Sequence, residues 1–313
     1  MSGGKKGATA AAPASAAAPS KKVVAKARAA WENSRTAAVR ALLWRSDGGE
    51  PVDLLADLSA LCSMPAAPPA PGGGGGGPAV RITFAAPRCA GGAAAADAAL
   101  EDALFALTKA NMEPVYNDEA AGPGWRWSDS RKRGELFDRE TRFLVARAAG
   151  GGGEDDGELL AFLAFRLQCE GEFELLYVYE LQAAPAARRR GIGRRLMQLA
   201  ELLARRCGVQ WVMLTVLKHN AGARDFYARK MGYTASEEHP ICADRSMSHE
   251  VLGKAVHAAT ARARTEAAAA FAAGRLPAEM PQLPSPATAL VKAAATTPAP
   301  APAAAAAAPA LAP

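Results

Sequence analysis

Short apolar runs separated by turn-forming residues predict a sheet of six strands in this chain. Their β-branched and aromatic content favours strands over helices. The predicted strands are residues 80–84, 143–148, 159–167, 173–182, 210–217 and 246–252. The most apolar runs lie in the middle of the series, so we expect them at the centre of the sheet.

Apolar residues at helical spacing predict helices before and between these strands. The predicted helices are residues 21–44, 52–61, 97–111, 192–206 and 221–230. The stretch 112–138 holds two tryptophans, a tyrosine and many charges, which indicates a loop with a short helix. This order of elements predicts a mixed α/β fold.

Composition separates the folded part of the 313 residues from low-complexity segments rich in Ala, Gly and Pro. We expect five parts: a disordered Ala-rich start (1–20), a basic helical segment (21–64), a Pro/Gly linker (65–78), the main domain (79–257) and an Ala/Pro-rich disordered tail (258–313). The alternative for the tail is a helical extension before the disordered part.

Charge is concentrated at the start of the chain. The formal net charge is +6, and residues 1–50 alone hold nine Lys or Arg against three acids. This basic segment favours contact with nucleic acid, chromatin or another acidic surface. The alternatives are a solvated arm without a partner and an organelle transit peptide.

Several classes of protein are disfavoured. No run of about 18 apolar residues lacks both charge and proline, so we expect no membrane-spanning segment. Five cysteines without a CxxC pair argue against a disulfide-stapled secreted domain and favour a reducing compartment. Four scattered histidines give no metal site. We expect a monomer that does not bind membranes.

A glycine-containing turn is the first candidate site. Arg188–Gly193 (RRRGIG) lies between a strand and a strongly amphipathic helix. Gly191 and Gly193 let the backbone approach a ligand closely, and the helix start offers free N–H groups to an anion such as pyrophosphate. The third glycine of GxGxxG is absent, which disfavours a Rossmann site. The alternative is an ordinary tight turn with solvated arginines.

This R-x-x-G-x-G turn, with N-x-x-A-x-x-F-Y over Asn220–Tyr227 and the pair Gly232-Tyr233, resembles the acetyl-CoA signature of the GNAT acetyltransferases. The resemblance implies the GNAT (acyl-CoA N-acyltransferase) fold, with a mixed, mostly antiparallel sheet that splays at the acetyl-CoA site. It implies acetyl-CoA as cosubstrate and no metal. The implied cofactor-binding residues are Leu181, Gln182, Arg188, Arg189, Arg190, Gly191, Ile192, Gly193, Arg194 and Asn220. The alternative for Asn220 is that it only caps its helix.

Further positions resemble the NatD-type histone N-alpha-acetyltransferases over roughly residues 105–252. They are Asn111-Met112, Tyr116, Trp125-x-Trp127, Tyr177–Gln182, Leu214–Asn220 and Ser248–Leu252. The resemblance implies transfer of acetyl to the free N-terminal amine of tails that begin Ser-Gly, those of core histones two-A and four. Histone tails are then the expected partner, in nucleus and cytoplasm, with chromatin or ribosome contacted by the basic N-terminal segment.

Three residues are expected to be catalytic. Glu180 is charged in an otherwise apolar strand and is the candidate base, with Tyr179 beside it. Tyr227 is the candidate for returning a proton to the leaving thiolate. Adjacent strand residues point to opposite faces, so Tyr177, Tyr179 and Glu180 share one site only where the strand bulges or splays. The alternative for both tyrosines is packing.

The resemblance also implies a peptide slot. The expected substrate-binding residues are Tyr116, Trp125, Tyr177, Gln168, Glu170, Thr215 and Ser248, with Trp127 in the same wall. Gln168 stands where closer relatives are expected to have an aspartate. Acids expected near the substrate tail are Glu170, Glu172, Glu174, Glu237, Glu238 and Asp244. The alternative for the tryptophans is a loop anchored on the core.

Other functions fit the same patterns. A GNAT protein can acetylate lysine side chains or a small amine, and a chromatin-binding module can keep the fold without catalysis. Blocking the N-terminus of a peptide substrate distinguishes N-terminal acetylation from acetylation of lysine side chains. Removal of Met1 would expose Ser-Gly-Gly-Lys, which is either a self-acetylation site or a coincidence in a low-complexity start.

Overall fold

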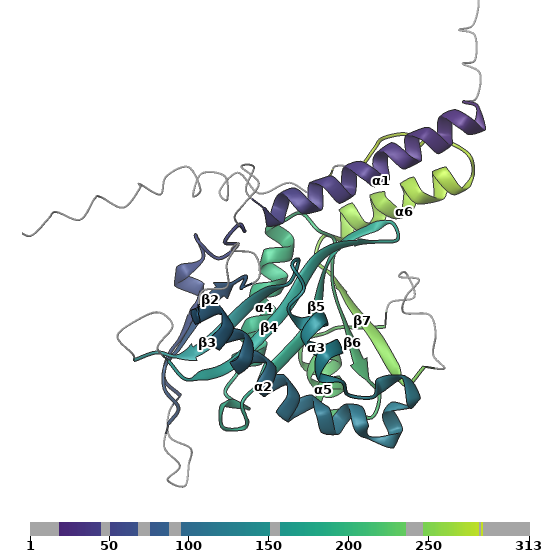
Figure 1. Ribbon diagram of the computed structural model, residues 1–313. Helices are drawn as coiled ribbons and strands as arrows, with labels where there is room; N and C mark the ends of the chain where they lie inside the picture. The colour runs from purple at the N-terminus through teal and green to yellow at the C-terminus, as the bar shows by residue number, and fades with distance from the viewer. Residues whose placement is uncertain are drawn as a thin grey trace, which may run out of the picture.

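Seven strands, adjacent in the same order as along the chain, form the sheet of the computed structural model (Figure 1). The structure describes residues 19–44, 51–67, 76–87, 95–150, 157–235, 247–281 and 283. The strands are β1 (Ser63–Met64), β2 (Val80–Ala85), β3 (Arg142–Ala148), β4 (Leu159–Glu170), β5 (Phe173–Ala183), β6 (Trp211–Leu217) and β7 (His249–Ala255). All neighbours are antiparallel except β5 and β6, which are parallel and joined by a helical crossover.

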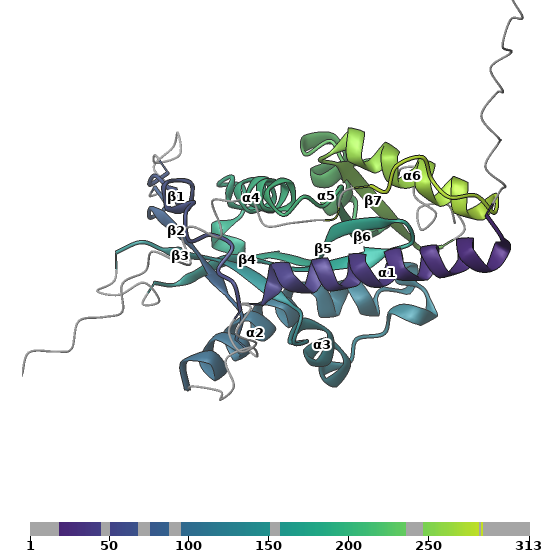
Figure 2. The same ribbon diagram turned by 90° about the horizontal axis from the view of Figure 1, so that it is seen from above.

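The described helices cover both faces of the sheet. They are α1 (Lys21–Leu43), α2 (Ala95–Asn117), α3 (Asp129–Leu136), α4 (Ile192–Arg206), α5 (Ala221–Arg224), which continues into a π-helical turn over Asp225–Lys230, and α6 (Ala258–Ala272). Figure 2 shows α4 and α5 on one face, with α2 and α3 on the other. None of the described helices is both long and apolar enough to cross a membrane.

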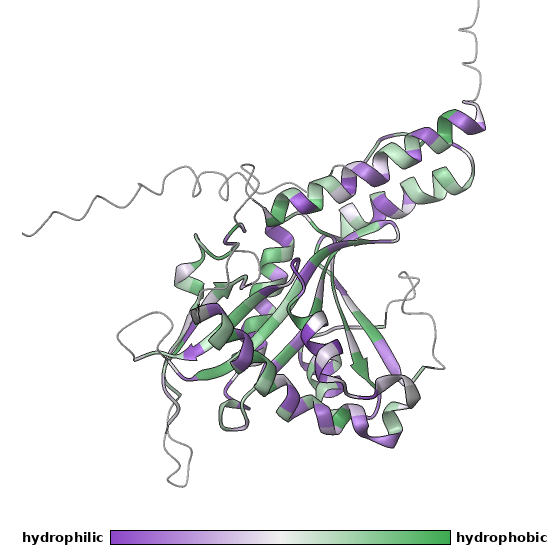
Figure 3. Cartoon of the chain, viewed as in Figure 1, coloured by the Kyte–Doolittle hydropathy of each residue, from purple (hydrophilic) through white to green (hydrophobic). Residues whose placement is uncertain are grey.

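The two faces bury separate hydrophobic clusters, and Figure 3 shows the hydrophobic residues gathered on the central strands. Leu196, Leu199 and Leu203 of α4 pack on one face, at the i, i+3, i+7 spacing of an inward helix side. Leu104 of α2 and Leu136 of α3 pack on the other face. The sheet is thus buried on both sides, which explains why its central strands are almost continuously apolar.

The sheet splays in its middle, as predicted. Pairing between β5 and β6 ends at Val178–Leu214, although both strands continue. The ladder between β4 and β5 also slips at this level, where Ala164 pairs with Glu180 but Phe165 pairs with Val178. Tyr179 is therefore the extra residue of a β-bulge, which changes the alternation of side chains along β5.

The predicted boundaries at both ends of the main domain are wrong. Leu42, Leu43 and Leu54 belong to the main core, and β1 pairs with β2, so the segment 21–64 is part of the same folded unit. The disordered tail predicted from residue 258 begins instead with α6, which packs against α1 through Trp31 and Phe271. These helices lie side by side in Figure 1.

Local differences from the predicted elements are small. The helix predicted over 52–61 is a single 3₁₀ turn at Ser59–Leu61, and the helix predicted over 97–111 extends to Asn117. The last strand begins at His249 rather than at residue 246. Residues 1–18 and 68–75 lie outside the described residues, with most of the predicted start and linker.

Candidate active site

A cleft of about 1220 Å³ opens where β5 and β6 separate. Its walls come from α2, α3, the loop before α3, the first turn of α4 and the segment Asn220–Lys230. Because β5 has no ladder pair with β6 beyond Val178, the backbone groups on the β6 side of its last residues face the cleft rather than a strand. Such groups can bind a ligand.

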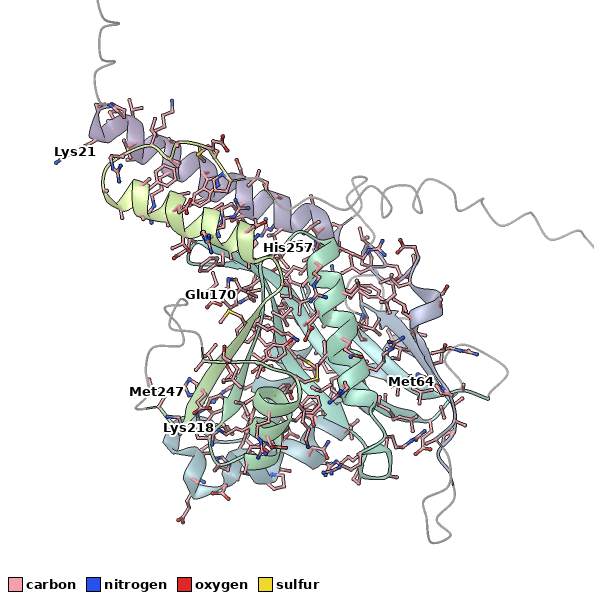
Figure 4. All side chains as sticks on the ribbon, turned by 180° about the vertical axis from the view of Figure 1, so that it is seen from behind. Lys21, Met64, Glu170, Lys218, Met247 and His257 are labelled. Atoms are coloured by element: carbon pink, nitrogen blue, oxygen red, sulfur yellow. The ribbon has the colours of Figure 1, made fainter. Side chains whose placement is uncertain are left out.

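The glycine turn forms one end of this cleft. Gly191 is the N-cap of α4 with φ +81, a left-handed conformation that favours glycine. A Cβ there would lie 3.8 Å from Met64 Cε, an ordinary contact, so the requirement is conformational rather than steric. Met64, the side chain next to this turn, is labelled in Figure 4. Arg189 also has a positive φ, 66°. The first N–H groups of α4 lack intrahelical acceptors and form an anion site.

The arginines of this turn differ in function. Arg188 donates to Asn111 Oδ1 at 2.6 Å and to the Ala183 carbonyl. Arg190 donates to the carbonyl of Pro78 and does not line the cleft, contrary to the prediction that it binds the cofactor directly. The predicted cofactor residues that do line the cleft are Leu181, Gln182, Arg188, Arg189, Gly191, Ile192, Gly193, Arg194 and Asn220.

Glu180 lies in the cleft with 5 % of its surface exposed. Its Oε1 accepts from Lys132 Nζ at 3.0 Å, and its Oε2 accepts from Gln182 Nε2 at 2.6 Å. Asn111 Nδ2 in turn donates to Gln182 Oε1 at 3.0 Å. A continuous chain of hydrogen bonds thus joins Arg188 of the glycine turn to Glu180.

Lys132 of α3 is a buried cation that the sequence interpretation missed. Besides Glu180, it donates to Glu135 Oε1 at 2.9 Å and to the Tyr116 hydroxyl at 3.2 Å. Burial by itself lowers the pKa of Lys132, but the neighbouring Glu180, Tyr116 and Glu135 reverse this and raise it above the usual value. The pKa of Tyr116 is raised by burial and by the charge of Glu180. The lysine is therefore an ammonium and the tyrosine a neutral phenol.

The two tyrosines of β5 share the face of Glu180. Their rings lie 5.3 Å apart, and their exposure is intermediate. The Tyr177 hydroxyl is hydrogen-bonded to Thr215, whereas the Tyr179 hydroxyl donates to Gln168 Oε1 at 3.2 Å. The bulge thus brings Tyr177, Tyr179 and Glu180 to one site, as predicted.

Glu170 lines the cleft beside Gln168 and is labelled in Figure 4. Burial raises the pKa of Glu170, and a hydrogen bond from Gln168 partly opposes this. Its Oε2 is buried without a hydrogen-bond partner in the described part of the chain. The carboxylate can therefore accept a hydrogen bond from a ligand.

An aromatic wall closes the other side of the cleft. The Tyr116 ring lies 5.4 Å from Trp125 and 5.8 Å from Trp127, and all three line the cleft. Trp125 also contacts His249, with its ring edge-on at 5.4 Å. The side chains expected at the peptide slot from 116 to 127 are thus brought together.

Other expected site residues lie elsewhere. Ser248 does not line the cleft, and its hydroxyl donates to the Ala121 carbonyl at 2.6 Å. Glu174 is fully buried and paired with Arg35 and Arg264, so the expectation that it faces a substrate tail is wrong. Glu172 does not line the cleft. Glu237, Glu238 and Asp244 lie outside the described residues.

Comparison with known proteins finds one family model that matches the central part of the chain. Residues 103–233 match the model of the acetyltransferase (GNAT) family. These residues include the cleft walls from α2 to the end of α5, with both motifs that carry the resemblance. This part of the chain is therefore similar to GNAT acetyltransferases.

Several solved structures are similar to this chain over part of its length. Nourseothricin acetyltransferase is 28% identical over 38% of this chain and 66% of its own, with a TM-score of 0.29. This chain therefore spans just under two thirds of that protein. Tetrahymena GCN5 is 15% identical over 52% of this chain and 91% of its own (TM-score 0.39). Arabidopsis thaliana NAA60, in complex with a bisubstrate analogue, is 15% identical over 47% and 95% (TM-score 0.31).

The fold is the GNAT fold, and GNAT acetyltransferases use acetyl-CoA. The cleft residues fit this cosubstrate: the left-handed Gly191 exposes the N–H groups of α4 to a pyrophosphate, and Arg189 and Arg194 add positive charge. Bound acetyl-CoA supplies an acetyl group activated as a thioester. The described residues contain no cluster of three His, Cys, Asp or Glu suited to a metal.

The last two motif residues of the GNAT domain have clear positions. Asn220 caps α5, with its Oδ1 accepting from Ala223 N at 3.2 Å, and it lines the cleft. Tyr227 is buried at the cleft wall. Burial, followed by the charge of Glu180, raises the pKa of Tyr227, so the phenol is neutral and can donate a proton.

Asn111 and Lys132 are the polar residues of the GNAT site whose contacts the sequence interpretation missed. Lys132 lies four residues before the buried Leu136 on α3, so both face inward at i, i+4 spacing. This spacing is the signal that could have identified the lysine. Its partner Glu180 is 48 residues away, and no local pattern predicts that pairing.

Proposed function

We propose that the protein transfers acetyl from acetyl-CoA to the free N-terminal amine of histone tails that begin Ser-Gly, those of core histones two-A and four. The observation that carries this proposal is the meeting of Glu180 with the aromatic wall of Tyr116 and Trp125. Lys132 hydrogen-bonds both Glu180 and Tyr116, so the candidate base adjoins the candidate peptide slot. The NatD-like residues of the sequence supply the substrate class.

The chemistry follows from the positions of these groups. An α-amine has a pKa of about 8, so a useful fraction is neutral near pH 7. The amine nitrogen bonds to the acetyl carbon as the bond from that carbon to sulfur breaks. Glu180 takes the amine proton, directly or through water, and Tyr227 returns a proton to the sulfur so that CoA leaves as the thiol. Backbone N–H groups of the splayed β5 can hold the thioester oxygen.

Flat aromatic side chains suit a small first residue followed by glycine, because neither presents a bulky side chain to the wall. Glu170 has a carboxylate oxygen without a partner and lies at the same cleft, where it can bind a basic residue of the tail. Gln168 carries no charge, so we expect it to contribute hydrogen bonds rather than charge to substrate binding.

The partner and location proposals rest on the basic start of the chain. Lys22, Lys26 and Arg40 of α1 are exposed. We expect this face to contact chromatin or the ribosome, in nucleus or cytoplasm, with the protein as a monomer. High salt should weaken such contacts, because they are electrostatic.

The experiment that tests the proposal uses purified protein, acetyl-CoA and three peptides, read by mass spectrometry. They are Ser-Gly-Arg-Gly-Lys with a free N-terminus, the same peptide N-terminally blocked, and a peptide with a bulky first residue. We expect one acetyl group on the α-amine of the first peptide alone, lost in Glu180→Gln. Equal acetylation of the blocked peptide would make lysine the target and contradict the proposal.

A further inference from the structure

Lys132 belongs to α3, yet its ammonium lies inside the cleft and 6 % of its side chain is exposed. An ammonium has three protons, and three acceptors surround it: Glu180, Glu135 and Tyr116. Burying a charge is costly unless it is fully paired, so a lysine without a role here would be more stable at the surface. The arrangement points to a role at the site.

Lys132 fixes the carboxylate of Glu180. One oxygen accepts from Lys132 and the other from Gln182, whose own amide is held by Asn111. Each carboxylate oxygen has two lone pairs, so each keeps one for a substrate proton. Glu180 therefore presents a single orientation to the cleft without being blocked.

The positive charge of Lys132 also offsets the negative charge that Glu180 presents to an amine substrate. A buried carboxylate without a neighbouring cation stabilises an incoming amine as an ammonium, which has no lone pair to attack the thioester. The ionisable groups facing Lys132 are Glu180 from β5, Glu135 from α3 and Tyr116 from α2. Tyr116 and Gln182 are neutral, so Lys132 is the positive charge nearest to Glu180 among its described contacts.

We propose that Lys132 is a positioning residue for acetyl transfer: it holds the carboxylate of Glu180 in place and offsets its charge, so that the amine substrate reaches the cleft neutral. This rests on the proposed role of Glu180 as base. The proton balance is unchanged by Lys132, which gives up no proton: the amine proton passes to Glu180, and the sulfur receives its proton from Tyr227.

The test is the pH profile of kcat/KM for Ser-Gly-Arg-Gly-Lys in wild type, Lys132→Met, Lys132→Arg and Glu180→Gln. In Lys132→Met, the incoming amine holds its proton to higher pH, because the charge of Glu180 is no longer offset. We expect the acid limb to move up by about one pH unit, with most activity restored above it. Lys132→Arg keeps the charge and should keep the limb. Lys109→Met is the matched control, since Lys109 pairs with Asp129 of α3 at 2.8 Å and does not line the cleft.

A double variant tests whether Lys132 acts through Glu180. We expect Lys132→Met to lower kcat/KM about tenfold in the wild-type background. In the Glu180→Gln background we expect it to lower kcat/KM less than twofold, because the partner side chain is already neutral. Equal losses in both backgrounds, or an unmoved acid limb, would overturn the inference. Lys132→Gln is measured if Lys132→Met fails to fold. Wild-type protein inactive on this peptide would instead refute the proposed substrate, and the same profiles would then be taken with a lysine substrate.

Discussion

Arg264 Nε donates to Glu174 Oε2 at 2.8 Å, and solvent reaches neither side chain. Arg35 of α1 pairs with the other oxygen of the same carboxylate. Helices from the two ends of the described chain thus meet at Glu174, at the start of β5 and three residues before Tyr177. The strand that carries Glu180 is therefore anchored at its start by α1 and α6.

This relationship predicts that Arg264→Ala destabilises the protein strongly. Arg35 still pairs with Glu174 in this variant, but Glu174 Oε2 is left buried without its donor, which costs about 2 kcal/mol. Urea denaturation measures the change, and Arg262→Ala is the control, because Arg262 is exposed on the same helix. That variant should change the free energy of unfolding by less than about 0.5 kcal/mol. Equal midpoints for the two variants would show that α6 does not anchor β5.

The turn at Gly191 predicts a defect confined to the cosubstrate. Gly191→Ala places a Cβ in ordinary van der Waals contact with Met64 but on a left-handed backbone, at a cost of about 1 kcal/mol. Relief of this strain would rotate the N–H groups that face the anion, so we expect the Kd for acetyl-CoA to rise with the peptide KM unchanged. Isothermal titration calorimetry measures it. Gly134→Ala in α3 is the control, since a Cβ there meets nothing within 4 Å and its φ is not positive.

Much of this site could be predicted from the sequence, because its backbone parts are encoded locally. The turn at Gly191, the cap at Asn220 and the apolar β5 each lie within a few residues of the signals that define them. The bulge at Tyr179 followed from requiring three neighbouring side chains to share one face.

What could not be predicted depends on partners far away in the chain. In the sequence Glu174 is one of three closely spaced acids, with Glu170 and Glu172. Only its pairing with Arg35 and Arg264, which are distant in the chain, explains why it is buried. The Ala-rich α6 has little amphipathic pattern, so its packing against Trp31 leaves no local signal. Lys132 likewise gains its role from Glu180.

The contact between Trp125 and Tyr116 predicts a peptide-specific defect. Trp125→Ala removes the middle of the aromatic wall between Tyr116 and His249. We expect KM for the Ser-Gly peptide to rise about tenfold, which corresponds to about 1.4 kcal/mol of lost binding, with KM for acetyl-CoA unchanged. Steady-state kinetics with each substrate varied separately measures both. A fall in kcat alone would place Trp125 in the chemistry instead of the peptide slot.

Tyr227 predicts a pH-dependent effect on both activity and stability. Tyr227→Phe should lower kcat by about a hundredfold with little change in either KM, because a general acid acts only in the transition state.

Burial and the charge of Glu180 raise the pKa of Tyr227 above the unfolded value of about 10. The neutral phenol therefore adds stability that is fully present below pH 10 and is lost as pH rises towards the folded pKa. Denaturation midpoints between pH 9 and 11 should fall less steeply in Tyr227→Phe than in wild type. Parallel slopes would mean that the phenol ionises equally in both states, and an unchanged kcat would leave the sulfur to take its proton from water.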